Sequence, residues 1–327
     1  MISIVQPDMK VVQRLPQAPR WRNVWKVMEE ANPLPLAHVP VRVRLRPDNG
    51  AFKPKKSGEN MAELPELELL KQKLRRNILS KRVNMMQVRN AKGEWLADGT
   101  GIDEAAFKGK SITDLHRYGQ YMFLELDRKD ILALQLGGEL TAELVRGPAS
   151  QETEDEVRAA LEIQINGHQR LRLQGTQLGN RLRMLDENSD VDFLTKLGPD
   201  PLMVHGEGLA VLREALSRRR SALRNILLDD SFAPGIGAIW ADEILYQARL
   251  RPDRTAPSLS DEERDRFLEQ IPKVLDRAVR CQAKTNLLPK TFLTRHREDN
   301  HCPGCGGHLE TLSVGGKNAL FCPACQL

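Results

Sequence analysis

The chain has 327 residues, of which 40% are hydrophobic and 28% are charged, with a net charge of +5. This composition excludes wholesale disorder and fibrous repeats, and the length predicts about two domains with an appendage. Because no apolar run approaches the length of a membrane span and the chain does not open like a signal peptide, we expect a cytoplasmic protein without membrane contact.

Residues 1–60 differ in composition from the rest of the chain. They contain eight of the 19 prolines and carry 11 basic but only 5 acidic side chains. Trp21 and Trp25 fall in a short helical pattern within this stretch. We expect residues 1–60 to form a basic, proline-rich extension that is loosely ordered or not translated at all.

We predict that residues 61–190 form an antiparallel β-sandwich-like domain that begins with a helix. Leu64–Leu79 has apolar residues at helical spacing, and Pro65 lies in the first turn, where proline is tolerated. Asn166-Gly167 is a typical two-residue hairpin signal between two apolar runs. The predicted strands are Val83–Val88, Tyr121–Leu126, Ile131–Leu136, Leu161–Ile165 and Leu171–Leu173.

Residues 191–295 read as a helical domain. The predicted helices are Leu209–Leu216, Ser221–Leu228, Ala238–Arg249 and Asp261–Ala283. Ser260 and Glu263 have the spacing of a capping box at the start of the last helix. The segment Pro234-Gly235-Ile236-Gly237 lies between two helices, where glycines allow backbone amides to approach a phosphate, although an ordinary tight turn would look the same.

Residues 296–327 carry a metal-binding pattern. Two C-x2-C pairs are separated by 16 residues, with Gly315-Gly316 suited to a hairpin turn between them. Two disulfides are the alternative, but an intracellular chain favours one structural Zn²⁺ with all four positions filled. The predicted ligands are Cys302, Cys305, Cys322 and Cys325.

Three segments in this order resemble the formamidopyrimidine-DNA glycosylase and endonuclease VIII family. They are Ala62–Glu68, which resembles Pro-Glu-Leu-Pro-Glu-Val-Glu, the stretch Gly235–Leu245, and the zinc hairpin. Leu197–Leu202 also matches the join between the family's two domains. The resemblance covers residues 61–327 and implies an α+β multidomain fold: a β-sandwich-like domain, a helix-two-turn-helix domain and a C-terminal zinc β-hairpin.

The resemblance also implies a function in base-excision repair of double-stranded DNA that is damaged or abasic. Family members flip the damaged base out of the stack. Their N-terminal proline amine attacks C1′ of the sugar, a neighbouring glutamate moves protons, and elimination cuts the strand. The corresponding catalytic positions here are Ala62, Glu63 and Glu66. The two glutamates would also be favoured in the first turn of any helix.

Several of these positions depart from the family pattern. Gln120 stands where the family has a phosphate-gripping lysine, and Ala238 stands where it has an asparagine. Lys317 replaces an arginine of the zinc hairpin and keeps the charge but not the bidentate fork. The expected DNA-binding positions are therefore Gln120, Gly235, Gly237, Ala238 and Lys317. The loop 175–180 lacks the arginines and the aromatic residue that the family inserts beside the flipped base.

Ala62 decides whether the chemistry can occur. In the full chain its nitrogen is an amide, which cannot form a Schiff base. If translation begins at Met61 and the methionine is removed, Ala62 carries a primary amine with a pKa near 8.

Three hypotheses follow from these observations. The first is a monomeric DNA glycosylase with AP lyase activity, associated with the nucleoid. The second is a zinc-containing DNA-binding homologue that has lost catalysis. The third is a scaffold that docks a protein partner through Trp21 and Trp25.

Overall fold

The computed structural model describes residues 63–88, 107–127, 130–136, 141–146, 159–166, 169–174, 182–185 and 192–327. The predicted extension 1–60, Ala62 and the loop 175–180 lie outside these residues. Among the described helices, none is both long and apolar enough to cross a membrane.

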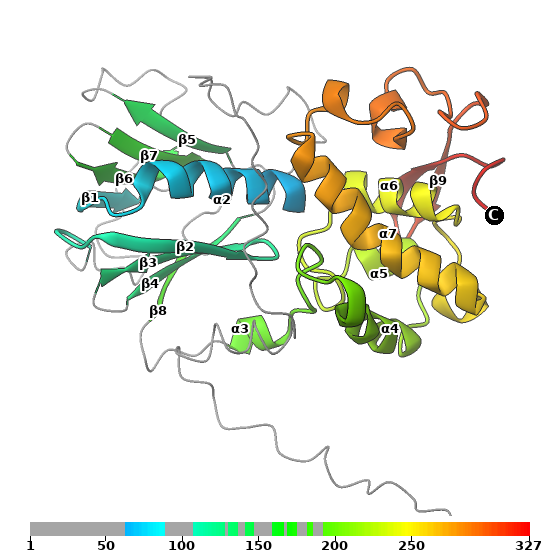
Figure 1. Cartoon of the computed structure of the whole chain (residues 1–327), viewed down its shortest axis with the longest axis horizontal. Helices are drawn as coiled ribbons and strands as arrows, with labels where there is room; N and C mark the ends of the chain where they lie inside the picture. Colours follow the sequence, from blue (N-terminus) through cyan, green and yellow to red (C-terminus); the bar gives the residue numbers. More distant parts are fainter. Residues whose placement is uncertain are drawn as a thin grey trace, which may run out of the picture.

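The first half of the described chain is a pair of antiparallel sheets enclosing a helix (Figure 1). One sheet has the order β1-β6-β7-β5 and the other the order β2-β3-β4-β8. Helix α2 spans Leu64–Ile78. The strands are β1 (Val83–Val88), β2 (Ile112–Tyr118), β3 (Tyr121–Leu126), β4 (Ile131–Gln135), β5 (Thr141–Arg146), β6 (Ala159–Ile165), β7 (Gln169–Gln174) and β8 (Leu182–Leu185).

Helix α2 joins the two halves of the molecule. Leu67, Leu74 and Ile78 are buried in one core with side chains from both sheets, whereas Leu64 is buried in the core of the helical half. Figure 1 shows the first turn of α2 directed toward the helices. The start of α2 is therefore fixed by both halves at once.

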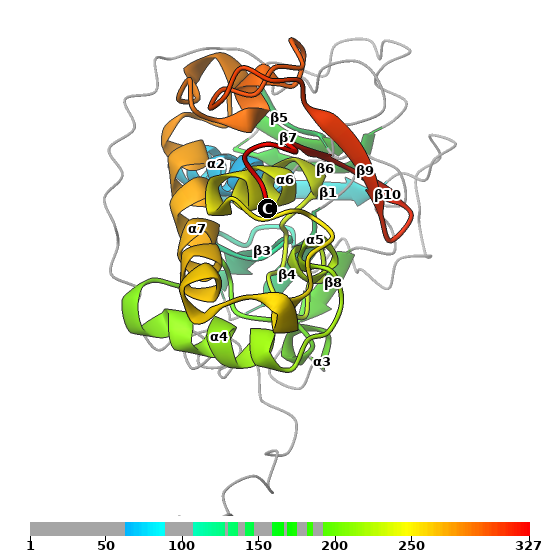
Figure 2. The same ribbon diagram turned by 90° about the vertical axis from the view of Figure 1, so that its right-hand side faces the viewer.

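The second half is helical and ends in a hairpin. Its elements are α3 (Asp192–Thr195), α4 (Leu209–Ser217), α5 (Leu223–Leu227), α6 (Ala238–Ala248), α7 (Asp261–Arg280), β9 (Glu310–Val314) and β10 (Lys317–Phe321). Short 3₁₀ turns cover Gly206–Gly208, Ala256–Ser258, Thr285–Leu287 and Leu293–His296. Figure 2 shows α7 beside α6, with the β9–β10 hairpin on the other side of α6.

Several local predictions are confirmed. The capping box is present, because Ser260 Oγ accepts from Glu263 N while the Glu263 carboxylate accepts from Ser260 N. Gly315 and Gly316 both have positive φ and connect β9 to β10, which favours glycine in this turn. The predicted β6–β7 hairpin also forms, but Ile165 pairs with Gln169, so three residues connect the strands, not two.

Candidate functional site at the junction of the two halves

The site centres on Glu63, which lies immediately before α2 and caps the start of α6. Its carboxylate accepts hydrogen bonds from Ile239 N at 3.0 Å and Trp240 N at 3.1 Å, and the residue is only 6% exposed. The first amides of a helix have no partner within the helix and carry partial positive charge. The carboxylate therefore satisfies two of these amides and places its negative charge at the favourable end of α6.

Gly237 makes room for this carboxylate. A Cβ built on Gly237 would lie within 2.5 Å of Glu63 Cγ, so a side chain here would force the carboxyl group away from α6. Leu64 N also donates to Gly235 O at 2.9 Å. Two contacts thus fix Glu63 and Leu64 against the glycine turn, and the space that the Glu63 carboxyl group occupies explains why position 237 needs glycine.

Burial shifts the protonation of both glutamates. It raises the pKa of Glu63 to about 7, even though the two amides of α6 lower it. Burial, together with the nearby negative charge of Glu63, raises the pKa of Glu66 to about 8. Trp240 Nε1 donates to Glu66 at 3.4 Å. At neutral pH the two carboxyl groups can both take up and release protons, as general acid–base chemistry requires.

Gln120 and Gly235, which the sequence predicts to contact DNA, are brought together by a third residue. Gln120 Nε2 donates to Asp230 Oδ2 at 2.6 Å, and Gly235 N donates to Asp230 Oδ1 at 3.0 Å. Asp230 precedes the glycine turn and was not a predicted site residue. The pair Asp229-Asp230 beside a glycine turn is the one sequence signal that could have indicated it.

The remaining predicted contact positions are more open. Ala238 is exposed at the first position of α6, and Lys317 is exposed at the start of β10. Among the described residues, no acceptor is found for the N–H groups of Gly237 and Ala238. Within the described part of the chain, these two amides are therefore without a partner at the positive end of α6, next to Glu63.

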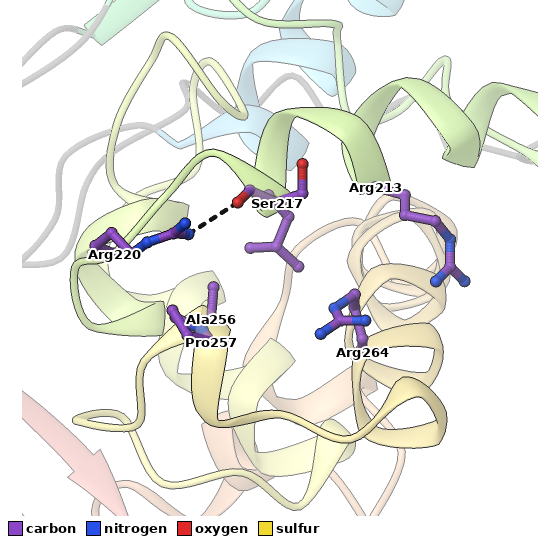
Figure 3. Close-up of a pocket in the computed structure, with 7 residues that line it drawn as sticks. Arg213, Ser217, Arg220, Ala256, Pro257 and Arg264 are labelled. Carbon is purple, nitrogen blue, oxygen red and sulfur yellow. Dashed lines mark hydrogen bonds between the residues drawn. The ribbon is translucent and has the colours of Figure 1, made fainter.

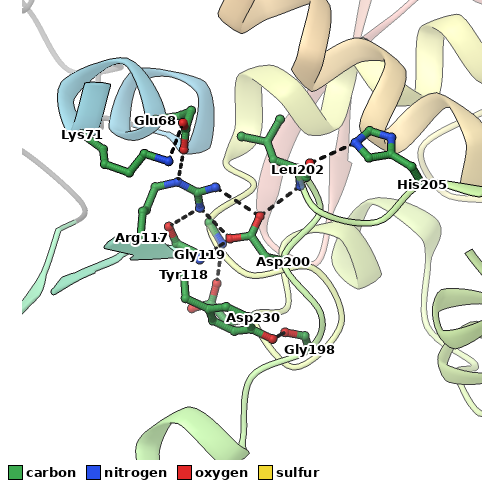
Figure 4. Close-up of polar contacts among 11 residues, drawn as sticks. Glu68, Lys71, Arg117, Tyr118, Gly119, Gly198, Asp200, Leu202, His205 and Asp230 are labelled. Atoms are coloured by element: carbon green, nitrogen blue, oxygen red, sulfur yellow. Dashed lines mark hydrogen bonds and ion pairs between the residues drawn. The ribbon is translucent and has the colours of Figure 1, made fainter. Parts of the chain in front are cut away.

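A buried ion network holds the β2–β3 turn to the helical half (Figure 4). Arg117 donates to Glu68 at 2.9 Å and to both oxygens of Asp200, at 2.6 Å and 3.2 Å. Asp200 also accepts from Gly119 N at 2.7 Å and from Leu202 N at 3.0 Å. Because Gly119 precedes Gln120, this network positions the turn that presents Gln120 to Asp230.

The four predicted metal ligands form one cluster. Their sulfur atoms all lie within 4.8 Å of one another, with 3.7 Å from Cys302 to Cys325 and 3.6 Å from Cys305 to Cys322. A tetrahedral site with Zn–S bonds of about 2.3 Å has S–S edges of about 3.8 Å. The cysteines fit a structural zinc ion, and Tyr246 Oη lies 3.3 Å from the Cys302 sulfur.

Buried polar contacts join this hairpin to the helical core. Arg224 donates to Asp242 at 2.9 Å and to Asn318 O at 2.6 Å, and Asp242 also accepts from Leu320 N at 3.1 Å. Both charged side chains are fully buried. The position of Lys317 is therefore set by the same contacts that hold the zinc hairpin on α5 and α6.

A separate cavity of about 340 Å³ lies between α4 and the start of α7 (Figure 3). Its wall includes Arg213, Arg220 and Arg264. Arg213 pairs with Asp265, and Arg264 pairs with Asp261. None of the predicted site residues lines this cavity, so it is distinct from the junction around Glu63.

The fold and the junction define a scaffold in which a β-sandwich, a glycine turn at a helix N-terminus and a zinc hairpin come together. Family models match along most of the described chain. They are the formamidopyrimidine-DNA glycosylase N-terminal domain at residues 61–186, the H2TH domain of the same glycosylase at 197–288, and the zinc finger found in FPG and IleRS at 301–327.

Individual relatives agree with these matches. The chain is 30% identical over 282 residues to the formamidopyrimidine-DNA glycosylase of Heliobacterium modesticaldum, covering 81% of this chain and 100% of the relative. It is 32% identical over 291 residues to the Thermus thermophilus protein of the same name, covering 81% of this chain and 98% of that relative. The chain belongs to the formamidopyrimidine-DNA glycosylase family.

Solved structures show the same fold. The Lactococcus lactis formamidopyrimidine-DNA glycosylase, bound non-covalently to DNA containing an AP site, superimposes with a TM-score of 0.67 at 21% identity, covering 81% of this chain and 99% of that one. A MutM structure in complex with DNA containing carbocyclic 8-oxo-G superimposes with a TM-score of 0.67 at 21% identity, covering 81% of this chain and 100% of that one.

Proposed function

We propose that the protein is a base-excision DNA glycosylase with AP lyase activity, which acts through the amine of Ala62 in a chain that begins at that residue. The observation that supports this most is the Glu63 carboxyl group, which is buried at the N-terminus of α6 with a pKa of about 7. An α-amine has a pKa near 8. A proton can therefore pass between adjacent groups of similar basicity.

In the proposed reaction the neutral amine forms a bond to C1′ of a damaged nucleotide while the bond from C1′ to the base breaks. The base leaves with a proton, and opening of the sugar ring gives an imine between Ala62 and C1′. Loss of a proton from C2′ then expels the 3′ phosphate, and water releases the amine. Glu63 would supply and accept protons in these steps, with Glu66 as its neighbour.

The proposed partner is double-stranded DNA that is damaged or abasic. The amides of Gly237 and Ala238 at the start of α6, which have no acceptor among the described residues, and exposed Lys317 are groups that attract phosphate. The solved relatives carry abasic or lesion-containing DNA. Because one chain supplies the carboxylates, the glycine turn and the zinc hairpin, a monomer suffices. We also propose a cytoplasmic, nucleoid-associated location.

A second candidate function is DNA binding without catalysis. The specific observation in its favour is that Gln120 already donates to Asp230 and that Ala238 has no polar side chain. Two predicted phosphate contacts are therefore weaker than in the family pattern. Such a protein would bind duplex DNA and leave it intact.

Borohydride trapping separates the two candidates. Borohydride adds hydride to an imine and leaves a stable protein–DNA adduct, whose position is mapped by peptide mass spectrometry. We expect no adduct at Ala62 in the full chain and an adduct at Ala62 in a chain that begins there. In reactions without borohydride, replacing Glu63 with Gln should slow turnover of the unreduced imine. Duplex binding without an Ala62 adduct in the shortened chain would support the second candidate.

A further inference from the structure

Asp230 occupies hydrogen-bond donors at the proposed DNA-binding turn. Its two carboxylate oxygens accept separately from Gly235 N at 3.0 Å and from Gln120 Nε2 at 2.6 Å. Asp230 is partly exposed, so solvent and a ligand can reach it. Figure 4 shows it below the Arg117–Asp200 network that holds the β2–β3 turn.

The Asp230 carboxylate is an anion, and it accepts from the same two N–H donors that a DNA phosphate would use here. Gly235 has φ of +87°, a conformation that suits glycine, and its amide is directed at Asp230. A phosphodiester that approached this amide or the Gln120 side chain would have to displace the carboxylate. It would also meet a negative charge of the same sign within a few ångströms.

We propose that Asp230 competes with a DNA phosphate for Gly235 N and Gln120, and thereby weakens binding to the duplex backbone. This inference rests on the proposed DNA-binding function. The remaining amides at the start of α6, with Lys317, would then supply the contacts to phosphate.

A merely structural role is the alternative, since Asp230 ties the β2–β3 turn to the α5–α6 connection. Asp230→Asn separates the two roles. The amide oxygen of Asn can still accept from Gly235 N, and its NH₂ group can donate to the Gln120 oxygen once that amide turns over. The tie is kept while the charge is removed.

Asp229→Asn is the matched control. It removes the same charge one residue earlier, where the Asp229 carboxylate pairs with Arg219 and accepts from Ser231. Asp229 makes no contact with Gly235 N or Gln120 among the contacts of the described chain. A general electrostatic effect would appear in both variants.

The experiment measures binding of the full chain to a labelled duplex with a tetrahydrofuran abasic analogue, by fluorescence anisotropy over a series of salt concentrations. We expect Asp230→Asn to tighten binding roughly tenfold, because a phosphate displaces a neutral amide from these donors more easily than a carboxylate and no longer meets its charge. The slope of log K against log salt should change by no more than about one phosphate contact, because Gly235 N and Gln120 are neutral donors that release no counterion. Asp229→Asn should change affinity by less than about twofold, as expected for a screened surface charge.

Two results would overturn the inference. In the first, Asp230→Asn binds the duplex no more tightly than the original chain. In the second, Asp230→Asn and Asp229→Asn raise the affinity equally, so that net charge alone explains the change. These results differ from failure of the proposed function, in which the original chain shows no duplex binding even at low salt. A thermal melt of each variant confirms that the comparison is between folded proteins.

Discussion

Removal of the Asp200 carboxylate is the sharpest test of how the two halves are joined. Asp200 is fully buried and accepts four hydrogen bonds: two from Arg117 and one each from the amides of Gly119 and Leu202. In Asp200→Ala, Arg117 keeps its bonds to Glu68 and to Gly119 O but loses its most buried partner.

The expected cost is large because the remaining charge stays buried. Breaking a buried ion pair by removing one partner costs about 3–5 kcal/mol, whereas exposed pairs contribute about 0–1 kcal/mol. The Arg117 guanidinium is 1% exposed and the Asp200 carboxylate 0%. The Arg251–Asp253 pair, whose side chains are 37% and 44% exposed, is the matched surface control.

Urea unfolding followed by far-UV circular dichroism measures both variants. We expect Asp200→Ala to lose about 3 kcal/mol or more and Asp253→Ala less than about 1 kcal/mol. Adding Arg117→Met to Asp200→Ala should recover part of the loss. The remaining cluster of Arg117, Lys71 and Glu68 has one positive charge too many, and this change removes it. Equal effects of Asp200→Ala and Asp253→Ala would refute the claim that this network fixes the junction.

Three other predictions concern the hairpin, the glycine turn and the glutamates. Cys302→Ser should abolish stoichiometric zinc and loosen the hairpin, as measured by elemental analysis and by proteolysis of the C-terminus. Gly237→Ala should destabilise by about 1–3 kcal/mol because its Cβ overlaps the Glu63 carboxyl group, whereas Gly208→Ala, with its nearest atom at 3.7 Å, should not. Burial raises the pKa of Glu66 from 4.5 to about 8, so between these values the native state holds a proton that the unfolded chain releases. The protonated carboxyl group therefore contributes fully to folding stability below pH 4.5, and this contribution is lost as pH rises to about 8. Glu66→Gln should therefore gain stability relative to the original chain between pH 5 and pH 9, as measured by melting temperature, and an unchanged difference would contradict the raised pKa.

The elements that periodicity predicted are those with a strong local apolar pattern. Helix α2, the four main helices of the second half and five of the eight sandwich strands were expected close to their observed bounds. The unpredicted strands β2, β5 and β8 all lie at sheet edges. Edge position alone does not explain this, because β1 is also an edge strand and its bounds were predicted. In β2, the buried Arg117 interrupts the apolar pattern, and its partner Asp200 is 83 residues away.

In the candidate site too, residues whose partners are near in the sequence were predictable, and residues whose partners are far away were not. The zinc ligands were predictable because each C-x2-C pair is local and the two pairs are joined by one hairpin. The roles of Asp200 and Asp230 depend on partners 81 to 110 residues away in the chain. No spacing rule encodes these contacts, which arise only when the β2–β3 turn packs against the helical half.

The start of α2 shows why the geometry of this junction and its chemistry can be separated. Glu63 is fixed by the amides of α6 and by the absence of a side chain on Gly237, and Leu64 N is fixed by Gly235 O. These contacts hold the Glu63 carboxylate and the Leu64 amide, and they do not set the chemical state of the nitrogen of residue 62. Its reactivity depends on something else, since an amide nitrogen cannot form an imine and a free amine can. If the proposed function holds, the packing of Glu63 fixes the carboxyl group that moves protons, and the end of the mature chain determines whether there is a nucleophile at all.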